Sequence, residues 1–201
     1  PDSWAKQLRE RRAPMAELEN ADVVLTVPYK TVKNLPDPRP LLKTWSEIIA
    51  CDARLTGLPV KRRFPERICA DIQLCAGYMH AGYPIMIPLH SAKHLVNNKT
   101  IREGSVDDVW GFFHEMGHNH QNDDWTFNGS VEVTVNFFSL YCLEKICGRS
   151  IRDNHKIGGQ RFKRYVDEWY KTGKSFERWK SEPFLALDFF ARLIEKYGWE
   201  S

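Results

Sequence analysis

The stretch WGFFHEMGHNHQ, residues 110–121, constrains this chain more than any other part of its sequence. Within it, His114, Glu115 and His118 form the pattern H-E-x-x-H. Residues four apart on a helix lie on the same face, so the two imidazoles can bind one metal ion. Glu115 can then reach a water molecule on that metal and take its proton. The pattern predicts a helix that carries a hydrolytic zinc site with Glu115 as the catalytic base.

Chance is the competing explanation of this pattern. A chain with this content of histidine and glutamate would contain H-E-x-x-H about once in fifty sequences. A pair of histidines on one helix face can also be a surface or core feature with no metal. The zinc hypothesis therefore depends on whether the rest of the sequence supplies a third ligand.

A zinc peptidase needs a third protein ligand and leaves a fourth position for water. Asp124 lies six residues after His118, which is the spacing of the metzincin pattern H-E-x-x-H-x-x-G-x-x-H/D. That pattern has a glycine where this chain has Gln121. It also requires a methionine turn, and no methionine follows Met116. Both departures disfavour Asp124.

His120 and Glu132 are the other candidates for the third ligand. On a continuing helix His120 points away from His118, so we expect it to orient ligands or to contact the last helix carbonyls. Glu132 lies in the first turn of the next predicted helix, and a helix–turn–helix path can fold it over the histidines. A glutamate there could also serve only the helix dipole. Because an H-E-x-x-H motif precedes this glutamate, we favour the metal role and predict His114, His118 and Glu132 as the metal ligands.

The rest of the chain predicts an α+β fold, with a small mixed sheet in the N-terminal half and a mostly helical C-terminal half. Extended segments are predicted at residues 21–29, 63–74 and 83–89, and helices at 41–56, from Ser105 to about 121, and at 130–147, 160–171 and 183–197. Pro84 and Pro88 favour an edge strand, because proline donates no hydrogen bond to a sheet. An edge strand beside the metal helix could pair with an extended substrate.

The length of 201 residues suits one domain. We predict a single zincin-like catalytic domain over residues 1–201, with a strand-rich part at 14–121 that carries the metal helix and a helical part at 122–201 that carries the third ligand. The chain starts PDSWAKQ, without methionine, and ends YGWES just after a predicted helix. We interpret it as a piece excised from a longer protein, so the absence of a signal peptide says little about compartment.

Charge, hydropathy and cysteine content exclude several classes. A net charge of +3 is too small to indicate nucleic-acid or membrane-surface binding, and no apolar run is long enough to span a membrane. The five cysteines are odd in number and include no C-x-x-C. Neither a disulfide framework nor a cysteine zinc site is therefore indicated, and we expect most of the cysteines to be buried thiols.

Peptide hydrolysis also needs a donor for the developing oxyanion. Tyr83, Tyr78 and His80 are candidates for this role or for contacts with substrate, because the extended segment 76–89 is expected to line the cleft. The sequence does not select among them. Asn119 and Asn136 are further candidates for orienting the metal ligands.

Two consecutive segments, WGFFHEMGHNHQ and WTFNGSVEVTVNFFSLY, resemble the enhancin-like zinc metallopeptidases, which form metallopeptidase family sixty. The signature of that family is H-E-x-x-H followed by a downstream glutamate. Further matches are ADVVLTVPY, PERICADIQLCAGYMHAGYPIM and FFARLIEKYGWE, so the likeness runs from about Pro14 to Trp199. The combined pattern is far more specific than H-E-x-x-H alone.

The resemblance implies one Zn²⁺ per domain, held by His114, His118 and Glu132, with Glu115 as the catalytic base. It implies a zinc-dependent endopeptidase of the gluzincin type whose partners are protein substrates bearing mucin-type O-glycans, cleaved near a glycosylated Ser or Thr. It favours a secreted or cell-surface location. Family enzymes usually add carbohydrate-binding and β-sandwich modules, which this chain does not contain.

Two other functions compete with the mucin-degrading peptidase. The distant TRP-channel-associated relatives of the family suggest a catalytically silent zincin-fold module that binds or regulates. The intact histidine pair and Glu115 disfavour it. A zinc aminopeptidase would need a G-x-M-E-N segment to hold the amino terminus of its substrate, and this sequence has none.

Overall fold

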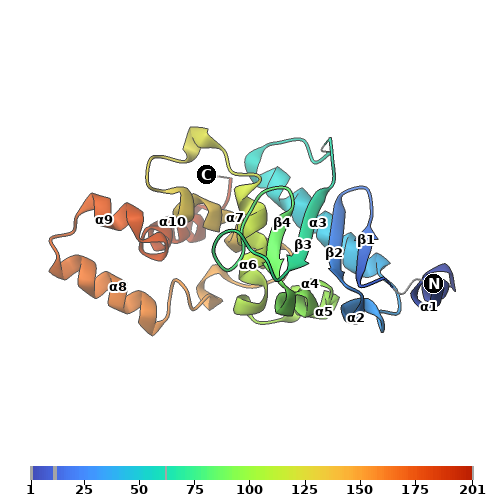
Figure 1. Ribbon diagram of the computed structural model, residues 1–201. Coiled ribbons are helices and arrows are strands. Elements are labelled where there is room, and N and C mark those ends of the chain that lie inside the picture. The colour runs from blue at the N-terminus through green and yellow to red at the C-terminus, as the bar shows by residue number, and fades with distance from the viewer. Residues whose placement is uncertain (1, 11–12, 62, 201) are drawn as a thin grey trace.

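A four-stranded mixed sheet lies at the centre of the protein. The computed structural model describes residues 2–10, 13–61 and 63–200. The strands are β1 (Met15–Glu19), β2 (Val23–Pro28), β3 (Glu66–Asp71) and β4 (Ile85–Pro88), in the order β1-β2-β3-β4 (Figure 1). β1 is antiparallel to β2, whereas β2, β3 and β4 are parallel. The predicted α+β fold is confirmed.

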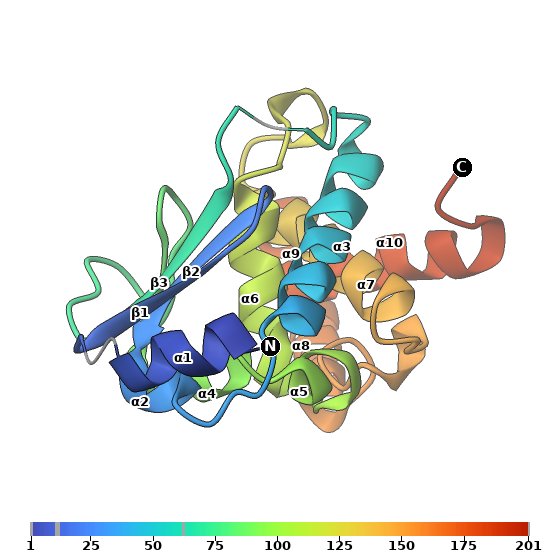
Figure 2. The ribbon, with the colours of Figure 1, turned by 90° about the vertical axis from the view of Figure 1, so that its right-hand side faces the viewer.

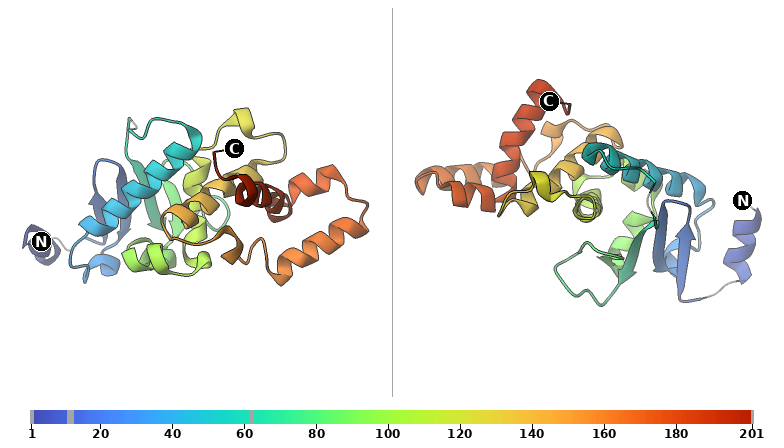
Figure 3. Two further views of the ribbon diagram at one scale, coloured as in Figure 1. Left: turned by 180° about the vertical axis from the view of Figure 1, so that it is seen from behind. Right: turned by 90° about the horizontal axis from the view of Figure 1, so that it is seen from above.

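The helices lie on one side of this sheet, at its ends or beyond it (Figure 2). They are α1 (Asp2–Glu10), α2 (Tyr29–Val32), α3 (Arg39–Thr56), α4 (Ala92–Leu95), α5 (Asn98–Glu103), α6 (Val106–His118), α7 (Val131–Lys145), α8 (Gln160–Lys171), α9 (Phe176–Ser181) and α10 (Pro183–Tyr197). Short 3₁₀ turns occur at Leu89–Ser91, Asp123–Trp125 and Ile151–Asp153. Figure 3 shows α8 and α9 projecting at the end of the molecule opposite α1. Within the described residues, no helix combines the length and apolar character needed to cross a bilayer.

Among the elements that were not predicted from the sequence are β1, α2, α5 and α9, and all of them are short. β1 buries one side chain well, that of Leu18, so its pattern carries little strand signal. α5 and α9 have six residues each, which is too few for a helical period to stand out. The predicted helix 130–147 is two residues too long at its end, so Cys147 lies beyond α7.

The main core lies between the sheet and the helices α3 and α6. Alternate residues of β2, β3 and β4 face it and are fully buried: Val23, Leu25, Ile68, Ala70, Ile85 and Ile87. From the helices, Trp45 of α3 meets Phe112 of α6 edge to face, with 6.1 Å between ring centroids. Each fully buried side chain of this size contributes about 1.5–3 kcal/mol. This packing fixes the face that α6 turns away from the sheet.

α6 and α7 approach each other closely at Gly117. A Cβ atom at this position would lie 2.8 Å from the Cβ of Phe138 on α7, closer than packed carbon atoms allow. Glycine therefore permits an approach that any side chain would prevent. The approach brings the first turn of α7 beside the last turns of α6, where the two histidines of the motif lie.

β4 is the edge strand of the sheet, as predicted, but its edge is covered. Pro84 and Pro88 have no N–H group, and the N–H of Met86 donates to the carbonyl of His80 at 2.9 Å. The N–H of His80 donates in return to the carbonyl of Met86 at 3.1 Å. The expectation that an extended substrate pairs with β4 itself is therefore corrected, because the segment 79–81 lies along that edge.

The cysteines also differ from expectation. Cys51 and Cys142 are buried, Cys69 and Cys147 are half-buried, and Cys75 is exposed. The prediction that most cysteines are buried was wrong. Cys69 alternates with the core-facing residues of β3, and Cys75 and Cys147 lie beyond the ends of β3 and α7.

Candidate metal and catalytic site

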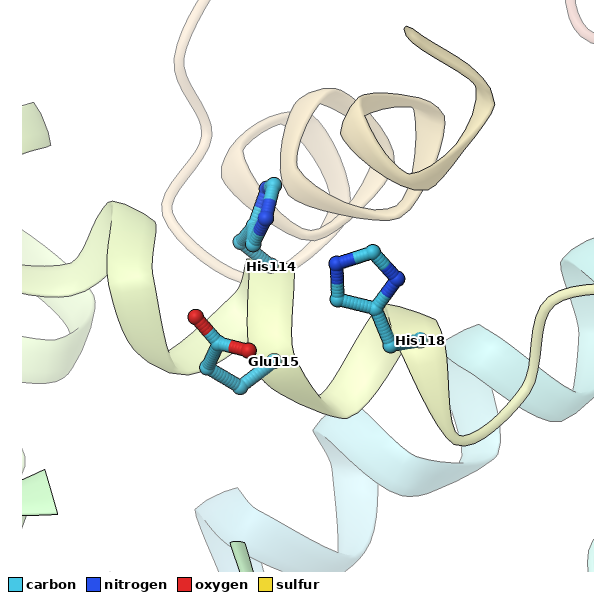
Figure 4. Close-up of side chains that lie close together, drawn as sticks. All are labelled: His114, Glu115 and His118. Carbon is cyan, nitrogen blue, oxygen red and sulfur yellow. The ribbon is translucent and has the colours of Figure 1, made fainter. Parts of the chain in front are cut away.

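The helix α6 presents the H-E-x-x-H residues on one side. Ser105 caps the helix: its hydroxyl accepts the N–H of Asp108, and the Asp108 carboxylate accepts the N–H of Ser105 at 3.1 Å. Phe112, Phe113 and Met116 are buried against the core. His114, Glu115 and His118 consequently project from the other side of α6 and are half-buried (Figure 4).

The structure brings Glu132 to both histidines. The imidazole rings of His114 and His118 lie at right angles, with 4.8 Å between their centroids. Oε2 of Glu132 lies 3.2 Å from Nε2 of His114, and Oε1 lies 3.6 Å from Nε2 of His118. Asp124, the metzincin alternative, lies in an exposed turn where its N–H donates to Asn122. The turn between α6 and α7 has therefore folded Glu132 back over the histidines.

The side chain of Asn136 selects the tautomer of His114. Its amide nitrogen donates to the backbone carbonyl of Glu132, so its oxygen faces the ring. That oxygen, Oδ1, lies 2.8 Å from Nδ1 of His114. Because an amide oxygen only accepts, Nδ1 carries the hydrogen and Nε2 of the neutral ring carries a lone pair. Asn136 was a candidate for orienting a ligand, and this contact gives it that geometry.

Gln121 makes the equivalent contact with His118. Its amide nitrogen donates to the carbonyl of Val131 at 2.8 Å and to the hydroxyl of Thr134. Its oxygen then lies 3.1 Å from Nδ1 of His118, which leaves a lone pair on Nε2 there too. From the sequence, Gln121 is only a departure from the metzincin glycine. An amide three residues after the second histidine is a weak signal that could have identified it.

The donor atoms at the site fit a divalent zinc ion. The two Nε2 atoms face the Glu132 carboxylate. While both rings are neutral, all of these atoms are acceptors, so either a proton or a metal cation can bridge them. In a tetrahedral zinc site with bonds of about 2.0–2.1 Å, ligand atoms lie about 3.3–3.4 Å apart. The distances of 3.2 and 3.6 Å from Glu132 to the two Nε2 atoms lie on either side of that value. Two imidazoles and one carboxylate also match the ligand types that zinc prefers.

Burial and neighbouring charges shift the pKa values of the ionisable groups. Burial raises the pKa of Glu115, although His114, His118 and the N–H of Ala81 act in the opposite direction. The hydrogen bond with His114 lowers the pKa of Glu132, and partial desolvation of this exposed residue acts in the opposite direction. Burial alone would lower the pKa of His114, but its hydrogen bonds with Glu132 and Asn136 raise it on balance. A raised pKa at Glu115 suits a carboxylate that must take up and release a proton.

The loop between β3 and β4 lies over α6. Asn119, at the end of the helix, accepts the N–H of Gly82 at 3.0 Å, and its amide nitrogen donates to the carbonyl of Gly82 and to Glu66. The N–H of Ala81 bonds the Glu115 carboxylate. Asn119 therefore holds this loop against the helix. His120 is buried, and its Nδ1 lies 2.9 Å from the carbonyl of Met116, the helix-end contact that we expected.

The three candidates for oxyanion or substrate contacts all lie on this loop. The hydroxyl of Tyr78 lies 2.6 Å from Nε2 of His90, and Nε2 of His80 lies 3.1 Å from the Cys75 sulfur. Tyr83 is exposed and interacts with the guanidinium of Arg67. None of these contacts is with His114 or His118. The oxyanion donor therefore stays a prediction.

Two cavities flank the candidate catalytic residues along α6. One, of about 410 Å³, is lined by Gly82, Tyr83 and Asn119 among others, at the carboxyl end of the helix. The other, of about 300 Å³, includes Met79 and Gly111, one turn before His114. Residues 79 to 82 run between them, over Glu115. The arrangement offers space on both sides of the candidate site.

Comparison with known proteins identifies a family for this chain. The sequence model of the family described as Peptidase M60, enhancin and enhancin-like matches residues 1–201. A TRPM8 channel-associated factor homolog from Xenopus laevis and TRPM8 channel-associated factor 2 from Homo sapiens are each 36% identical over 201 residues. Each alignment covers 99% of this chain but 22% and 21% of the relative, so the chain spans about a fifth of the length of these relatives.

Solved structures share the fold. A functionally unknown conserved protein from Bacillus anthracis str. Ames, in its mutant form, has a TM-score of 0.76 at 27% identity, over 98% of this chain and 41% of that one. A metallopeptidase from Bacteroides thetaiotaomicron and a metallopeptidase in complex with Tn antigen each have a TM-score of 0.63 at 15% identity. Both likenesses cover 94% of this chain, and 37% and 41% of those chains. At such identity the last two show the fold alone.

Proposed function

This chain belongs to the Peptidase M60, enhancin and enhancin-like family, and from that premise we propose that it is a zinc-dependent endopeptidase. The observation that carries the proposal is the convergence of two imidazole lone pairs and the Glu132 carboxylate beside Glu115. His114, His118 and Glu132 would hold the metal. Because α6 supplies two of these ligands and α7 the third, we further propose that residues 1–201 act as one catalytic domain, with ligands from both its 14–121 and its 122–201 parts.

Glu115 is the residue that moves protons in this proposal. Zinc, when bound, lowers the pKa of a water molecule and polarises the scissile carbonyl. Glu115 would accept the proton of the attacking water on its carboxylate and would later deliver it to the leaving amine. Burial raises the pKa of Glu115, which favours the protonated form that the second transfer needs. The N–H of Ala81 on the same carboxylate limits the rotation of the side chain.

Residues 79–81 are the segment along which an extended substrate would lie. His80 uses its N–H and carbonyl to pair with Met86, so the backbone groups of the neighbouring residues point away from β4, and the N–H of Ala81 reaches Glu115 on α6. A substrate strand that ran beside this segment, on the side of α6 where His114 and His118 lie, would place one peptide bond near Glu115. Its flanking residues would enter the two cavities. This path supports cleavage within a chain rather than at its amino terminus.

O-glycosylated proteins are the substrates that we propose. The support is the family membership and the fold shared with a metallopeptidase in complex with Tn antigen. The test compares an O-glycosylated peptide with the same peptide after removal of its glycans, with cleavage followed by mass spectrometry. We expect cleavage of the glycosylated form. Faster cleavage of the bare peptide would leave a zinc endopeptidase but contradict the glycoprotein specificity.

Two substitutions test the catalytic assignment. We expect Glu115→Gln to retain one zinc ion per chain and to lose cleavage by about 10²–10⁴-fold, because the proton acceptor is gone. We expect His118→Ala to lose the zinc, because one of its three ligands is removed. Zinc content is measured by inductively coupled plasma mass spectrometry, and cleavage on the same samples. If Glu115→Gln cleaves at the wild-type rate, Glu115 is not the base.

A catalytically silent module is the second candidate function. It is favoured by the two relatives with 36% identity, which are named as TRPM8 channel-associated factors. Such a module would keep this fold and use it to bind or regulate a partner. The zinc and cleavage measurements also separate this candidate. Stoichiometric zinc without cleavage of any peptide or glycoprotein would favour it over the peptidase.

A further inference from the structure

Cys75 and His80 form a thiol–imidazole pair on the loop between β3 and β4. The sulfur of Cys75 lies 3.1 Å from Nε2 of His80. The other ring nitrogen, Nδ1, lies 2.9 Å from the carbonyl of Ala81. Because a carbonyl only accepts, Nδ1 carries the hydrogen and Nε2 is free to accept the thiol proton. The backbone therefore orients His80 as a base towards a nucleophilic atom, which is the geometry that activates a thiol.

Cys75 differs from the other four cysteines in its surroundings. Burial raises the pKa of the thiols of Cys51, Cys69, Cys142 and Cys147, to about 11 in Cys147. Cys75 is exposed, so a reagent can reach it. The thiol of Cys142 donates to a buried carboxylate, Asp52, and that of Cys147 to the carbonyl of Ile101. Among the five, Cys75 is the one with an imidazole as its described partner.

We propose that Cys75, with His80 as its base, is a site of covalent modification by small soft electrophiles such as alkyl halides and Michael acceptors. With an alkyl halide, the sulfur forms a bond to carbon and the carbon–halogen bond breaks. The halide leaves with the bonding electron pair, and the thiol proton passes to Nε2 of His80 and then to water. This proposal does not depend on the peptidase function.

The position of the pair links its modification to the candidate catalytic site. Ala81 follows His80 and places its N–H on Glu115, and His80 itself holds the loop to Met86 of β4. An adduct on the sulfur removes the thiol hydrogen from the 3.1 Å contact with the ring, which allows His80 to shift. Such a shift acts on the backbone segment that lies over the catalytic helix.

Iodoacetamide labelling of the full chain tests the proposal. The protein is treated at pH 7 with a limiting amount of iodoacetamide, and the adduct at each of the five cysteines is quantified over time by peptide mass spectrometry. We expect Cys75 to react at least tenfold faster than Cys69 and Cys147. We expect His80→Gln to slow the reaction of Cys75 about tenfold or more, because the proton acceptor is lost.

His90→Gln is the matched control, since His90 lies nearby but pairs with Tyr78. It should leave the labelling rate of Cys75 unchanged. Thermal melting of each variant shows whether it is folded, and a His80→Gln variant that merely loosened the loop would label faster. The proposal is overturned if Cys75 reacts no faster than Cys69, or if His80→Gln reacts at the wild-type rate.

Discussion

Two side-chain amides hold the two imidazoles of the candidate metal site. The amide nitrogen of Asn136 is tied to the carbonyl of Glu132, and that of Gln121 to the carbonyl of Val131. Both carbonyls belong to the first turn of α7. The tautomer of each histidine therefore depends on the placement of the helix that also carries Glu132. Positioning of this kind strengthens a metal site without touching the metal.

We predict that Gln121→Leu and Asn136→Leu each weaken zinc binding about 10–100-fold, as removal of such partners does in other zinc sites. Leucine is close in size to both residues but accepts no hydrogen bond, so the Nδ1–H of the ring loses its partner. The measurement is a competition titration with a zinc-sensitive chelating dye. Asn122→Ser is the control: Asn122 is next to Gln121 but caps the following turn, a role that serine can keep. Wild-type affinity in both leucine variants would contradict this role of the amides.

The residues of the site differ in how far the sequence could predict them. His114, Glu115 and His118 follow from a spacing of four on one helix, and Glu132 from the position of the next helix. The role of Gln121 could not be predicted, because it depends on the turn geometry that brings its side chain back to His118. No periodicity in the sequence encodes that geometry. The contact of Ala81 with Glu115 could not be predicted either, because a backbone N–H donor does not depend on the type of residue.

At the scale of elements, the contact between α6 and α7 is set by a glycine. We predict that Gly117→Ala destabilises the protein by about 1–2 kcal/mol and weakens zinc binding at least tenfold. Alanine in a helix normally stabilises by roughly 0.5–1 kcal/mol relative to glycine. Here its Cβ would overlap three atoms of Phe138, and overpacking costs about 1–3 kcal/mol. Moving α7 away to relieve the overlap would draw Glu132 from the histidines.

Gly111→Ala on the same helix is the matched control for Gly117→Ala. Its Cβ would meet the sulfur of Met79, a flexible side chain that can move. We therefore expect this variant to be as stable as the wild type, or slightly more so, and to bind zinc normally. Urea denaturation and the dye titration measure both variants. Equal behaviour of the two alanine variants would contradict a special contact at Gly117.

The cap of α6 gives a prediction for pH dependence. The hydrogen bond with Ser105 lowers the pKa of Asp108, with His94 adding to the effect and burial and Asp107 opposing it. A carboxyl whose pKa is lower in the folded state stabilises the protein above its unfolded pKa, and this contribution is lost as the pH falls through the folded value. We expect Asp108→Asn to be less stable than the wild type at pH 7 by no more than about 0.3–1 kcal/mol, because the group is largely solvent-screened.

The difference in stability between Asp108→Asn and the wild type should shrink as the pH drops below about 4, the range in which a free aspartate protonates. Urea denaturation of both proteins from pH 7 to pH 3.5 measures it. A difference that stays constant over this range would mean that the charge of Asp108 contributes nothing to the cap. A difference in stability that grows as the pH falls would contradict a lowered pKa of Asp108 in the folded protein.

Among the elements, length decided what the sequence could predict. α3, α6, α7 and α10 are long enough to show a helical period, and the predicted span 183–197 agrees with α10. The cover over β4 could not be predicted, because it comes from the pairing of His80 with Met86 within an irregular loop. The two prolines indicated an edge strand correctly, yet they could not show what lies beside it.

At the scale of the whole molecule, α7 joins the two parts of the chain. It packs against α6 and α3 on one side and α10 on the other, so the C-terminal helices reach the sheet through it. The candidate metal site lies where α6 meets α7. A bound metal would therefore tie together the strand-rich part and the helical part of the chain, and its binding energy would add to the stability of the whole fold.

We predict that removal of zinc with EDTA lowers the melting temperature of the wild-type protein by about 5–10 °C. Free zinc at 100 times its dissociation constant stabilises a folded protein by about 2.7 kcal/mol, and in chains of this size 1 kcal/mol corresponds to about 2–4 °C. Differential scanning calorimetry measures the shift. His118→Ala should melt at the same temperature with and without EDTA, because it has already lost the site. If the wild type binds zinc but melts unchanged in EDTA, then the metal does not connect α6 and α7, and Glu132 is not its third ligand.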